Sequence, residues 1–201
     1  MASFRVHPRR ALLKGMAVAS IVGLLPRLSN LTSAQTPLAA TPGCGDGEEP
    51  TPPQTEGPYF TPNSLQRTLL RESGMTGTPI VLTGLVLTRS CVPLPDVLVE
   101  LWHADDAGVY DNEGYRLRGH QFTGADGSYR FATIVPGRYA GRTRHFHAKF
   151  QAPDQPVLTT QFYFPNETHN SRDRIFNPAL LLKITDGAEK IARFDVVLDI
   201  A

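Results

Sequence analysis

Short stretches in which apolar and polar residues alternate dominate the chain beyond Pro79, and this pattern predicts β-strands. Residues 80–88 are rich in β-branched side chains, which favour strands. In residues 191–200 every second side chain is apolar, as on one buried face of a sheet. Strands are expected at residues 80–88, 97–102, 128–134, 144–150, 159–164, 180–185 and 191–200. Short strands at this spacing predict an all-β fold, a β-sandwich.

Turn-forming residues separate the expected strands. Residues 93–96 (Pro-Leu-Pro-Asp) and 125–127 (Ala-Asp-Gly) are typical of turns, and Pro136 and Gly137 end the strand before them. Glycine and proline, at 17 residues each, favour many short strands over a helical bundle. The sequence has no internal repeat and no long amphipathic helix.

The overall composition is that of a globular protein without an excess of charge. The 201 residues suffice for one ordinary domain or two very small ones. Of these residues, 41% are hydrophobic and 19% charged, and the net charge is +1. Nucleic-acid binding is not expected, because there is no basic excess to displace counterions from phosphates.

The first 34 residues resemble a cleavable twin-arginine export signal. Arg9 and Arg10 precede apolar residues and a lysine, and the apolar run at 16–25 is too short to span a bilayer. Residues 32–34 (Thr-Ser-Ala) offer the small side chains of a cleavage site. The alternative is an ordinary secretory signal with an incidental arginine pair. Either predicts an exported, periplasmic or extracellular protein without stable membrane insertion, and the first predicts the twin-arginine export machinery as a partner.

The rest of the chain is expected to consist of an arm and one β domain. After the signal at 1–34, residues 35–54 form an extended arm rich in Pro, Gly and Thr, and residues 55–201 form the sandwich. Cys44 and Cys91, an even pair in an oxidising compartment, can form a disulfide; two unpaired thiols are the alternative. A small sandwich with one open sheet can also form a homo-oligomer, although no residue pattern requires it.

His145 and His147 form the sharpest local signal. Residues two apart in a strand point the same way, so both imidazoles are expected on one face, with Phe146 and Ala148 facing the sandwich. Two imidazoles from one strand can bind one metal ion. A surface strand with two solvated histidines would have the same sequence.

Tyr110 and Tyr139 strengthen the metal interpretation. Each lies in a loop that follows an expected strand, and Tyr139 comes six residues before His145. A loop tyrosine is usually a rim residue or a packed phenol with its hydroxyl bound to the backbone. A phenolate, however, is a hard anionic ligand suited to ferric iron. Two phenolates with two imidazoles would hold iron in the ferric state.

Seven motifs, taken in order, resemble those of the intradiol ring-cleavage dioxygenases, with protocatechuate 3,4-dioxygenase-type cores as the nearest relatives, in an exported subgroup. They are residues 55–60 (Thr-Glu-Gly-Pro-Tyr-Phe), 99–102 (Val-Glu-Leu-Trp), 108–110 (Gly-Val-Tyr), 123–131 (Thr-Gly-Ala-Asp-Gly-Ser-Tyr-Arg-Phe), 136–139 (Pro-Gly-Arg-Tyr), 142–147 (Arg-Thr-Arg-His-Phe-His) and 160–164 (Thr-Gln-Phe-Tyr-Phe). The ordered set is far more specific than any single motif.

The resemblance implies a β-sandwich that holds one Fe(3+) per chain and cleaves a catechol-type ring between its hydroxylated carbons with O2, giving a cis,cis-muconate. It implies that Tyr139 is displaced by the incoming small aromatic diol, that Arg142 stabilises charge developing on the ring, and that Gln161 lines the pocket. Tyr59 is expected to approach the pocket or to pack in the core. The iron ligands that the resemblance implies are Tyr110, Tyr139, His145 and His147.

A non-catalytic transthyretin-like β-sandwich module that binds sugar or protein is the alternative function. The stretch at residues 81–139, with its turn at 124–131, would suit such a module almost as well. It would not account for four ligand-type residues occurring together with Arg142 and Gln161, and that combination favours the enzyme.

Overall fold

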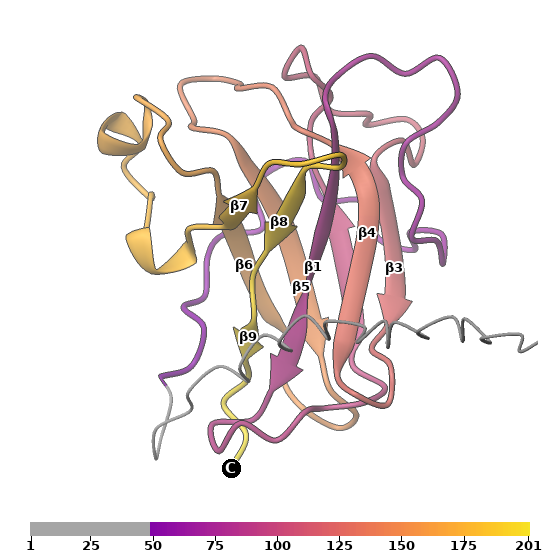
Figure 1. Cartoon of the computed structure of the whole chain (residues 1–201), viewed down its shortest axis with the longest axis vertical. Helices are drawn as coiled ribbons and strands as arrows, with labels where there is room; N and C mark the ends of the chain where they lie inside the picture. The colour runs from indigo at the N-terminus through magenta and orange to yellow at the C-terminus, as the bar shows by residue number, and fades with distance from the viewer. Residues whose placement is uncertain (1–48) are drawn as a thin grey trace, which may run out of the picture. The chain divides into compact units, whose positions relative to one another are not determined.

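Two β-sheets packed face to face make up the protein (Figure 1). The computed structural model describes residues 49–201, which form nine strands and two short 3-10 helices. The elements are β1 (Pro79–Leu87), β2 (Leu98–Trp102), β3 (Arg118–Phe122), β4 (Ser128–Ile134), β5 (His145–Gln151), β6 (Leu158–Tyr163), η1 (Asn170–Arg172), η2 (Pro178–Leu180), β7 (Lys183–Thr185), β8 (Ile191–Arg193) and β9 (Val196–Val197). The predicted all-β sandwich is confirmed.

The two sheets differ in how their strands run. One has the order β4-β1-β8-β7, and β9 also pairs with β1; β8 and β9 run parallel to β1. The other has the order β3-β2-β5-β6 and is antiparallel throughout. Because neighbours alternate in direction, β2 and β6 end where β5 begins. Strand β5 carries His145 and His147, and the three strands together bring Trp102, His147 and Gln161 into one row at this end of the sheet.

The hydrophobic core lies between the sheets. Leu82 and Phe131 from one sheet and Phe146, Phe150 and Phe162 from the other are completely buried. The large aromatic side chains bury much apolar surface, which is the main driving force for packing the two layers. This core explains why the inward-facing positions of the sequence are apolar.

Three details of the predicted strands are wrong. The expected strand at 191–200 is observed as two strands, β8 and β9. Asp195 lies between them, and there the backbone N–H of Leu85 donates to the Asp195 carboxylate and not to a backbone carbonyl of the neighbouring strand. The expected strand at 180–185 is shortened to β7, after η2. Strand β3 was not anticipated, because its Arg-Gly-His-Gln-Phe sequence has no apolar alternation.

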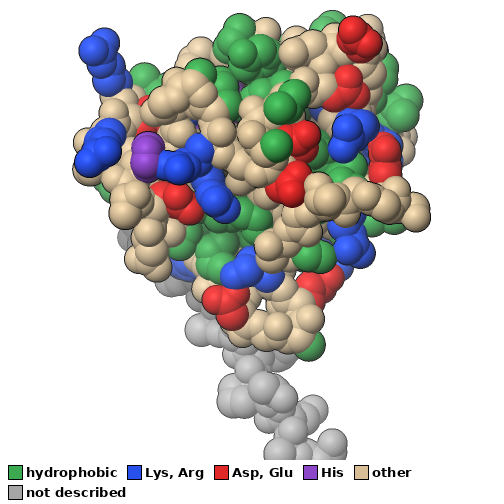
Figure 2. Space-filling view, turned by 90° about the horizontal axis from the view of Figure 1, so that it is seen from above, with side chains coloured by type: hydrophobic (Ala, Val, Ile, Leu, Met, Phe, Trp, Pro, Cys, Tyr) green, Lys and Arg blue, Asp and Glu red, His purple; other side chains and the backbone are tan. Residues whose placement is uncertain are grey.

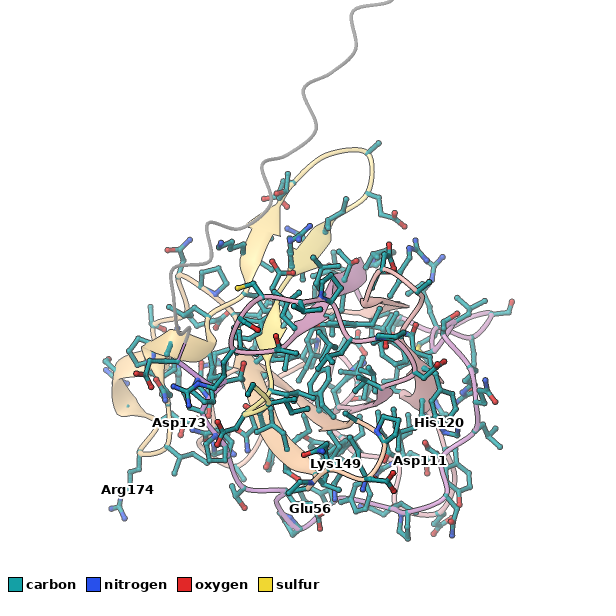
Figure 3. All side chains as sticks on the ribbon, turned by 90° about the horizontal axis from the view of Figure 1, so that it is seen from below. Glu56, Asp111, His120, Lys149, Asp173 and Arg174 are labelled. Atoms are coloured by element: carbon teal, nitrogen blue, oxygen red, sulfur yellow. The ribbon has the colours of Figure 1, made fainter. Side chains whose placement is uncertain are left out.

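The segment before β1 covers the outer face of the four-stranded sheet. Gln54 N donates to Thr159 O at the β6 edge, while His120 N donates to Leu65 O at the β3 edge. Between these points Glu56 forms an ion pair with Lys149 of β5, and Figure 3 shows the two residues together on this face. Both faces of β5 are therefore shielded from solvent.

Several predictions concern residues that the structure does not describe. The export signal at 1–34, most of the arm at 35–54 and Cys44 lie outside the described residues, so the signal and the pairing of Cys44 with Cys91 stay predictions. Within residues 49–201, no helix has the length and apolar character needed to cross a bilayer.

Candidate metal centre

Strand β5 places His145 and His147 side by side on the outer face of the four-stranded sheet. Phe146 and Ala148 lie in the core on the opposite face, as the alternation predicts. Both histidines are nevertheless almost completely buried, with exposures of 3% and 1%. Gly57 of the segment before β1 lies against His147, and the rings of Tyr139 and Tyr163 lie against His145. The alternative of two solvated surface histidines is therefore wrong.

The two imidazoles face each other through their Nε2 atoms. A carbonyl can only accept, so His145 Nδ1 donates to Thr143 O at 2.6 Å and its Nε2 carries a lone pair. That Nε2 lies 3.1 Å from Nε2 of His147, whose ring stacks on Trp102 at 4.9 Å. Burial lowers the pKa of His145 to about 4 and that of His147 well below its ordinary value. Both rings are therefore neutral, the form that binds metals.

The two predicted tyrosine ligands complete the cluster. Ring centroids lie 6.1 Å apart for Tyr110 and His147, 5.7 Å for Tyr139 and His145, and 5.1 Å for the two tyrosines. Tyr59 stacks on Tyr110 at 4.6 Å. Residues from two loops, one strand and the segment before β1 thus meet at one point.

Two glycines allow the tyrosine loops to approach each other. A Cβ on Gly108 would lie 2.1 Å from Arg138 O, and one on Gly137 would lie 2.4 Å from Gly108 N. Gly108 also has a φ of 85°, which favours glycine. Gly137 N donates to Asp105 O at 2.6 Å, which ties the loops together. The glycines of the Gly-Val-Tyr and Pro-Gly-Arg-Tyr motifs therefore bring Tyr110 and Tyr139 together.

The cluster has polar atoms for which the described part of the chain offers no partner. The hydroxyl of Tyr110 and Nδ1 of His147 are buried without a hydrogen bond to any described residue. Burial raises the pKa of Tyr110 strongly and also raises that of Tyr139, so removing either proton requires a compensating positive charge. Buried polar groups normally have partners.

The unpartnered Tyr110 hydroxyl and the two facing Nε2 atoms fit a bound ferric ion. The Tyr110 oxygen and the Nε2 lone pairs of His145 and His147 would coordinate it, and its charge would offset the cost of burying phenolates. No group of three His, Cys, Asp or Glu side chains converges anywhere in residues 49–201. A metal at this place therefore depends on the tyrosines, as expected for ferric iron.

Arg142 and Gln161, predicted to act on the substrate, are hydrogen-bonded to each other. Arg142 Nη2 donates to Gln161 Oε1 at 2.6 Å, and Gln161 Nε2 donates to Thr55 O at 2.8 Å. Gln161 pairs with His147 in the sheet register, which places it in the row of Trp102 and His147. The structure thus brings the predicted catalytic residues to the predicted ligands.

A hollow of about 350 Å³ borders the cluster at Tyr139 and Arg142. Arg138, Arg144 and His169 are also among the residues that line it. Figure 2 looks onto this end of the molecule, where basic side chains gather beside a histidine at one side. The half-buried Tyr139 therefore has space beside it, whereas Tyr110 is packed under Tyr59.

Tyr59, the predicted substrate-binding residue, packs against both of the predicted tyrosine ligands. Its ring lies 5.4 Å from that of Tyr139, and its carbonyl accepts from Arg118 Nη1 at 2.6 Å. Arg118 is itself buried and donates through Nε to Asp111 O at 3.1 Å. Arg118 therefore holds the segment carrying Tyr59 against the loop that follows Tyr110.

Sequence reasoning missed three residues around this centre: Trp102, Tyr163 and Asp173. Tyr163 follows Gln161 on the same strand face and donates to Gln161 Oε1 at 3.0 Å, so its alternation with Gln161 was an available signal. Trp102 precedes a polar loop, which gives no sign of a stack on histidine. Asp173 has no local signal at all, because its partner Arg142 is 31 residues away.

Comparison with known protein families and curated sequences finds dioxygenases. A family model described as Dioxygenase (Dioxygenase_C) matches residues 55–199. Hydroxyquinol 1,2-dioxygenase of Nocardioides simplex is 29% identical over 83% of this chain and 69% of that protein. The protocatechuate 3,4-dioxygenase beta chain of Burkholderia cepacia is 33% identical over 57% of this chain and 56% of that protein.

A solved structure shares both fold and sequence with the chain. It is the dioxygenase domain of a dioxygenase carbohydrate-binding protein fusion from the cellulolytic bacterium Streptomyces sp. SirexAA-E. The identity is 54% and the TM-score 0.74, over 76% of this chain and 100% of that one. An intradiol ring-cleavage dioxygenase from Tetranychus urticae, at 21% identity and a TM-score of 0.69 over 75% of this chain and 94% of that one, shares the fold.

Proposed function

This chain belongs to the intradiol ring-cleavage dioxygenases, a family of oxidoreductases, and from that premise we propose that it binds ferric iron through Tyr110, Tyr139, His145 and His147. We further propose that it cleaves the ring of a catechol-type compound between the two hydroxylated carbons. Both atoms of O2 are incorporated as that carbon–carbon bond breaks, and the product is of the cis,cis-muconate type.

One observation carries this proposal: two neutral imidazoles facing each other beside a buried tyrosine hydroxyl that lacks a partner among the described residues. Ferric iron at this point would supply the Lewis acidity that stabilises tyrosine and catechol oxygens in their deprotonated forms. The binding-module alternative gives no reason for this arrangement, and the family assignment favours the enzyme.

Tyr139 is the ligand suited to exchange with the substrate. It borders the hollow and is only half-buried, whereas Tyr110 is 7% exposed and stacked under Tyr59. As a diol takes its place, the Tyr139 oxygen would accept a proton from a substrate hydroxyl. Tyr110 and the histidines would remain in position.

Arg142 is placed to stabilise negative charge on the substrate. Burial alone would lower its pKa, but the hydrogen bond and charge of Asp173 outweigh burial and raise the pKa above its ordinary value. The guanidinium therefore stays cationic next to Tyr139.

Trp102 and Phe60 pack together at 4.9 Å and help exclude water from the floor of the site.

The decisive experiment is iron analysis and visible spectroscopy of the purified protein, before and after anaerobic addition of catechol. We expect one iron per chain and a phenolate-to-iron charge-transfer band that shifts with catechol and is weakened in Tyr110→Phe, which leaves Tyr139 as the single phenolate. Tyr115→Phe is the matched control, because the Tyr115 hydroxyl donates to Pro62 O away from the cluster. Colourless, iron-free protein that does not bind added ferric iron would contradict the proposal.

We also propose that residues 1–34 direct export through the twin-arginine pathway. The support is the sequence alone: the arginine pair, the short apolar run and the small residues after it. Replacing Arg9 and Arg10 with lysine should abolish export, measured as the fraction of processed protein outside the cytoplasm. Unchanged processing of this variant would favour an ordinary secretory signal.

A further inference from the structure

The Asp173 side chain is one of the few buried carboxylates in the described part of the chain. It lies just after η1, its side chain is 1% exposed, and in Figure 3 it turns inward while the neighbouring Arg174 points away from the molecule. Asp173 Oδ2 accepts from Arg142 Nε at 2.8 Å and from Thr143 N at 3.0 Å. Its Oδ1 accepts from Ile175 N at 3.2 Å. A buried carboxylate is stable only with such partners.

These contacts fix the plane of the Arg142 guanidinium. A guanidinium is rigid and planar, so a hydrogen bond at Nε determines where the neighbouring Nη2 points. Nη2 points at Gln161 Oε1, 2.6 Å away, and at the Tyr163 hydroxyl, 3.4 Å away. Without Asp173, the long side chain would be free to turn into the hollow that it lines.

We propose that Asp173 is a positioning residue that holds Arg142 in its orientation for ring cleavage. The role of Arg142 in turnover rests on the function proposed above, whereas the orientation itself rests only on the geometry of the described residues. A residue misplaced by about 1 Å can cost about 100-fold in rate, so a remote carboxylate can matter as much as a group that touches substrate.

A merely structural role is the competing explanation, since Asp173 also anchors the backbone at Thr143 and Ile175. The two roles differ in their dependence on Arg142. If Asp173 acts through Arg142, its removal has no further effect once the guanidinium is gone. If it only stabilises the fold, its removal has the same effect with or without Arg142.

The first test compares Asp173→Asn, Arg142→Met and the double variant. We expect Asp173→Asn to lower kcat/KM at least about 10-fold, and less than about 2-fold in the Arg142→Met background. Iron content and the anaerobic Kd for catechol should change less than about 3-fold in Asp173→Asn. An equal loss in both backgrounds, or no loss in either, would overturn the proposal.

Asp195→Asn is the matched control, because this carboxylate also accepts from an arginine, Arg193, and from a backbone N–H, that of Leu85, but in the other sheet. It should lower the melting temperature without the drop in kcat/KM. If Asp173→Asn does not fold, Asp173→Glu takes its place, since it keeps the charge while displacing the carboxylate.

The second test needs neither iron nor turnover. In the iron-free protein, the Arg142 Nε–H resonance, identified by its loss in Arg142→Met, should exchange with water at least about 10-fold more slowly than that of exposed Arg138. Asp173→Asn should abolish this protection. Fast exchange in the wild type would overturn the positioning role, whereas an inactive protein with protected Nε–H would refute only the dioxygenase function.

Discussion

At the scale of single residues, burial decides which side chains are available for chemistry. His145 and His147 are neutral because they are desolvated, and Tyr110 keeps its proton for the same reason. A cation at their meeting point would reverse that preference for Tyr110, because the phenolate would then have a partner. The same residues are unfavourable as a bare polar cluster and favourable as a ligand set.

His103 shows the opposite case, a buried histidine fully occupied by protein partners. Its Nδ1 donates to Ala104 O at 2.7 Å, and its Nε2 accepts from the Thr133 hydroxyl at 2.7 Å. The Thr133 contact joins the end of β2 to β4 in the other sheet. His103 is therefore a link between the sheets.

This link predicts a pH-dependent stability. Burial lowers the pKa of His103 to about 4, whereas the unfolded chain has the ordinary value of about 6.5. Between these values the unfolded state binds the extra proton. The contribution of His103 to the free energy of unfolding is therefore complete above about pH 6.5. It is lost as the pH falls towards 4, by up to about 1.4 kcal/mol per pH unit.

Urea unfolding of the wild type and His103→Asn between pH 7.5 and 4.5 measures this contribution. The stability gap between the two proteins should narrow as the pH falls. A gap that stays constant across the range would show that the pKa of His103 is the same in the folded and the unfolded protein.

At the scale of elements, close backbone approaches place the candidate ligands. Strand β5 sets the spacing of the histidines, but the tyrosine loops are brought together by Gly108 and Gly137. A side chain at Gly137 would meet backbone atoms of Gly108 and Asp106, which cannot move aside as a flexible side chain can. The position of Tyr139 thus depends on the absence of a neighbouring Cβ.

Gly137→Ala should therefore separate the two loops. We expect a loss of about 2 kcal/mol or more in the free energy of unfolding, typical of overpacking, together with weaker iron binding. Gly187→Ala is the control, because its Cβ would lie 3.7 Å from the nearest atom, at Glu189 O. Equal iron affinity in both variants would show that the loop contact does not position Tyr139.

At the scale of the whole molecule, the site lies outside the sandwich core. It is built on the outer face of the four-stranded sheet and closed by the segment before β1, through contacts such as Gln161 with Thr55 O and Lys149 with Glu56. Metal binding at this face would connect that segment, two loops and β5. Iron should therefore stabilise the whole fold.

Removal of iron by a chelator should lower the melting temperature. A metal that binds only the folded state adds about 4 kcal/mol when its free concentration is 1,000 times the Kd. For a chain of this length that corresponds to a shift of about 10 °C. Calorimetry with and without iron measures the shift, and Tyr110→Phe should show a much smaller one; an identical shift in both proteins would place the iron elsewhere.

Alternation along the chain determined most of the strands, β3 excepted, together with the common face of His145 and His147 and the opposite face of the core phenylalanines. These properties depend only on the two-residue period of a strand. The order of motifs also singled out Tyr110, Tyr139, Arg142 and Gln161 as candidates, because each lies within a short, specific string of residues. The sequence alone therefore specified the family and the candidate ligands.

Only the tertiary structure decided how these residues are enclosed and oriented. It showed that the segment before β1 covers His147, that two glycines bring the tyrosine loops together, and that Asp173 binds Arg142. Such contacts join residues far apart in the chain and depend on sheet pairing and loop packing. Because no local pattern of hydrophobicity or spacing encodes a contact of this kind, Asp173 became visible only in the folded protein.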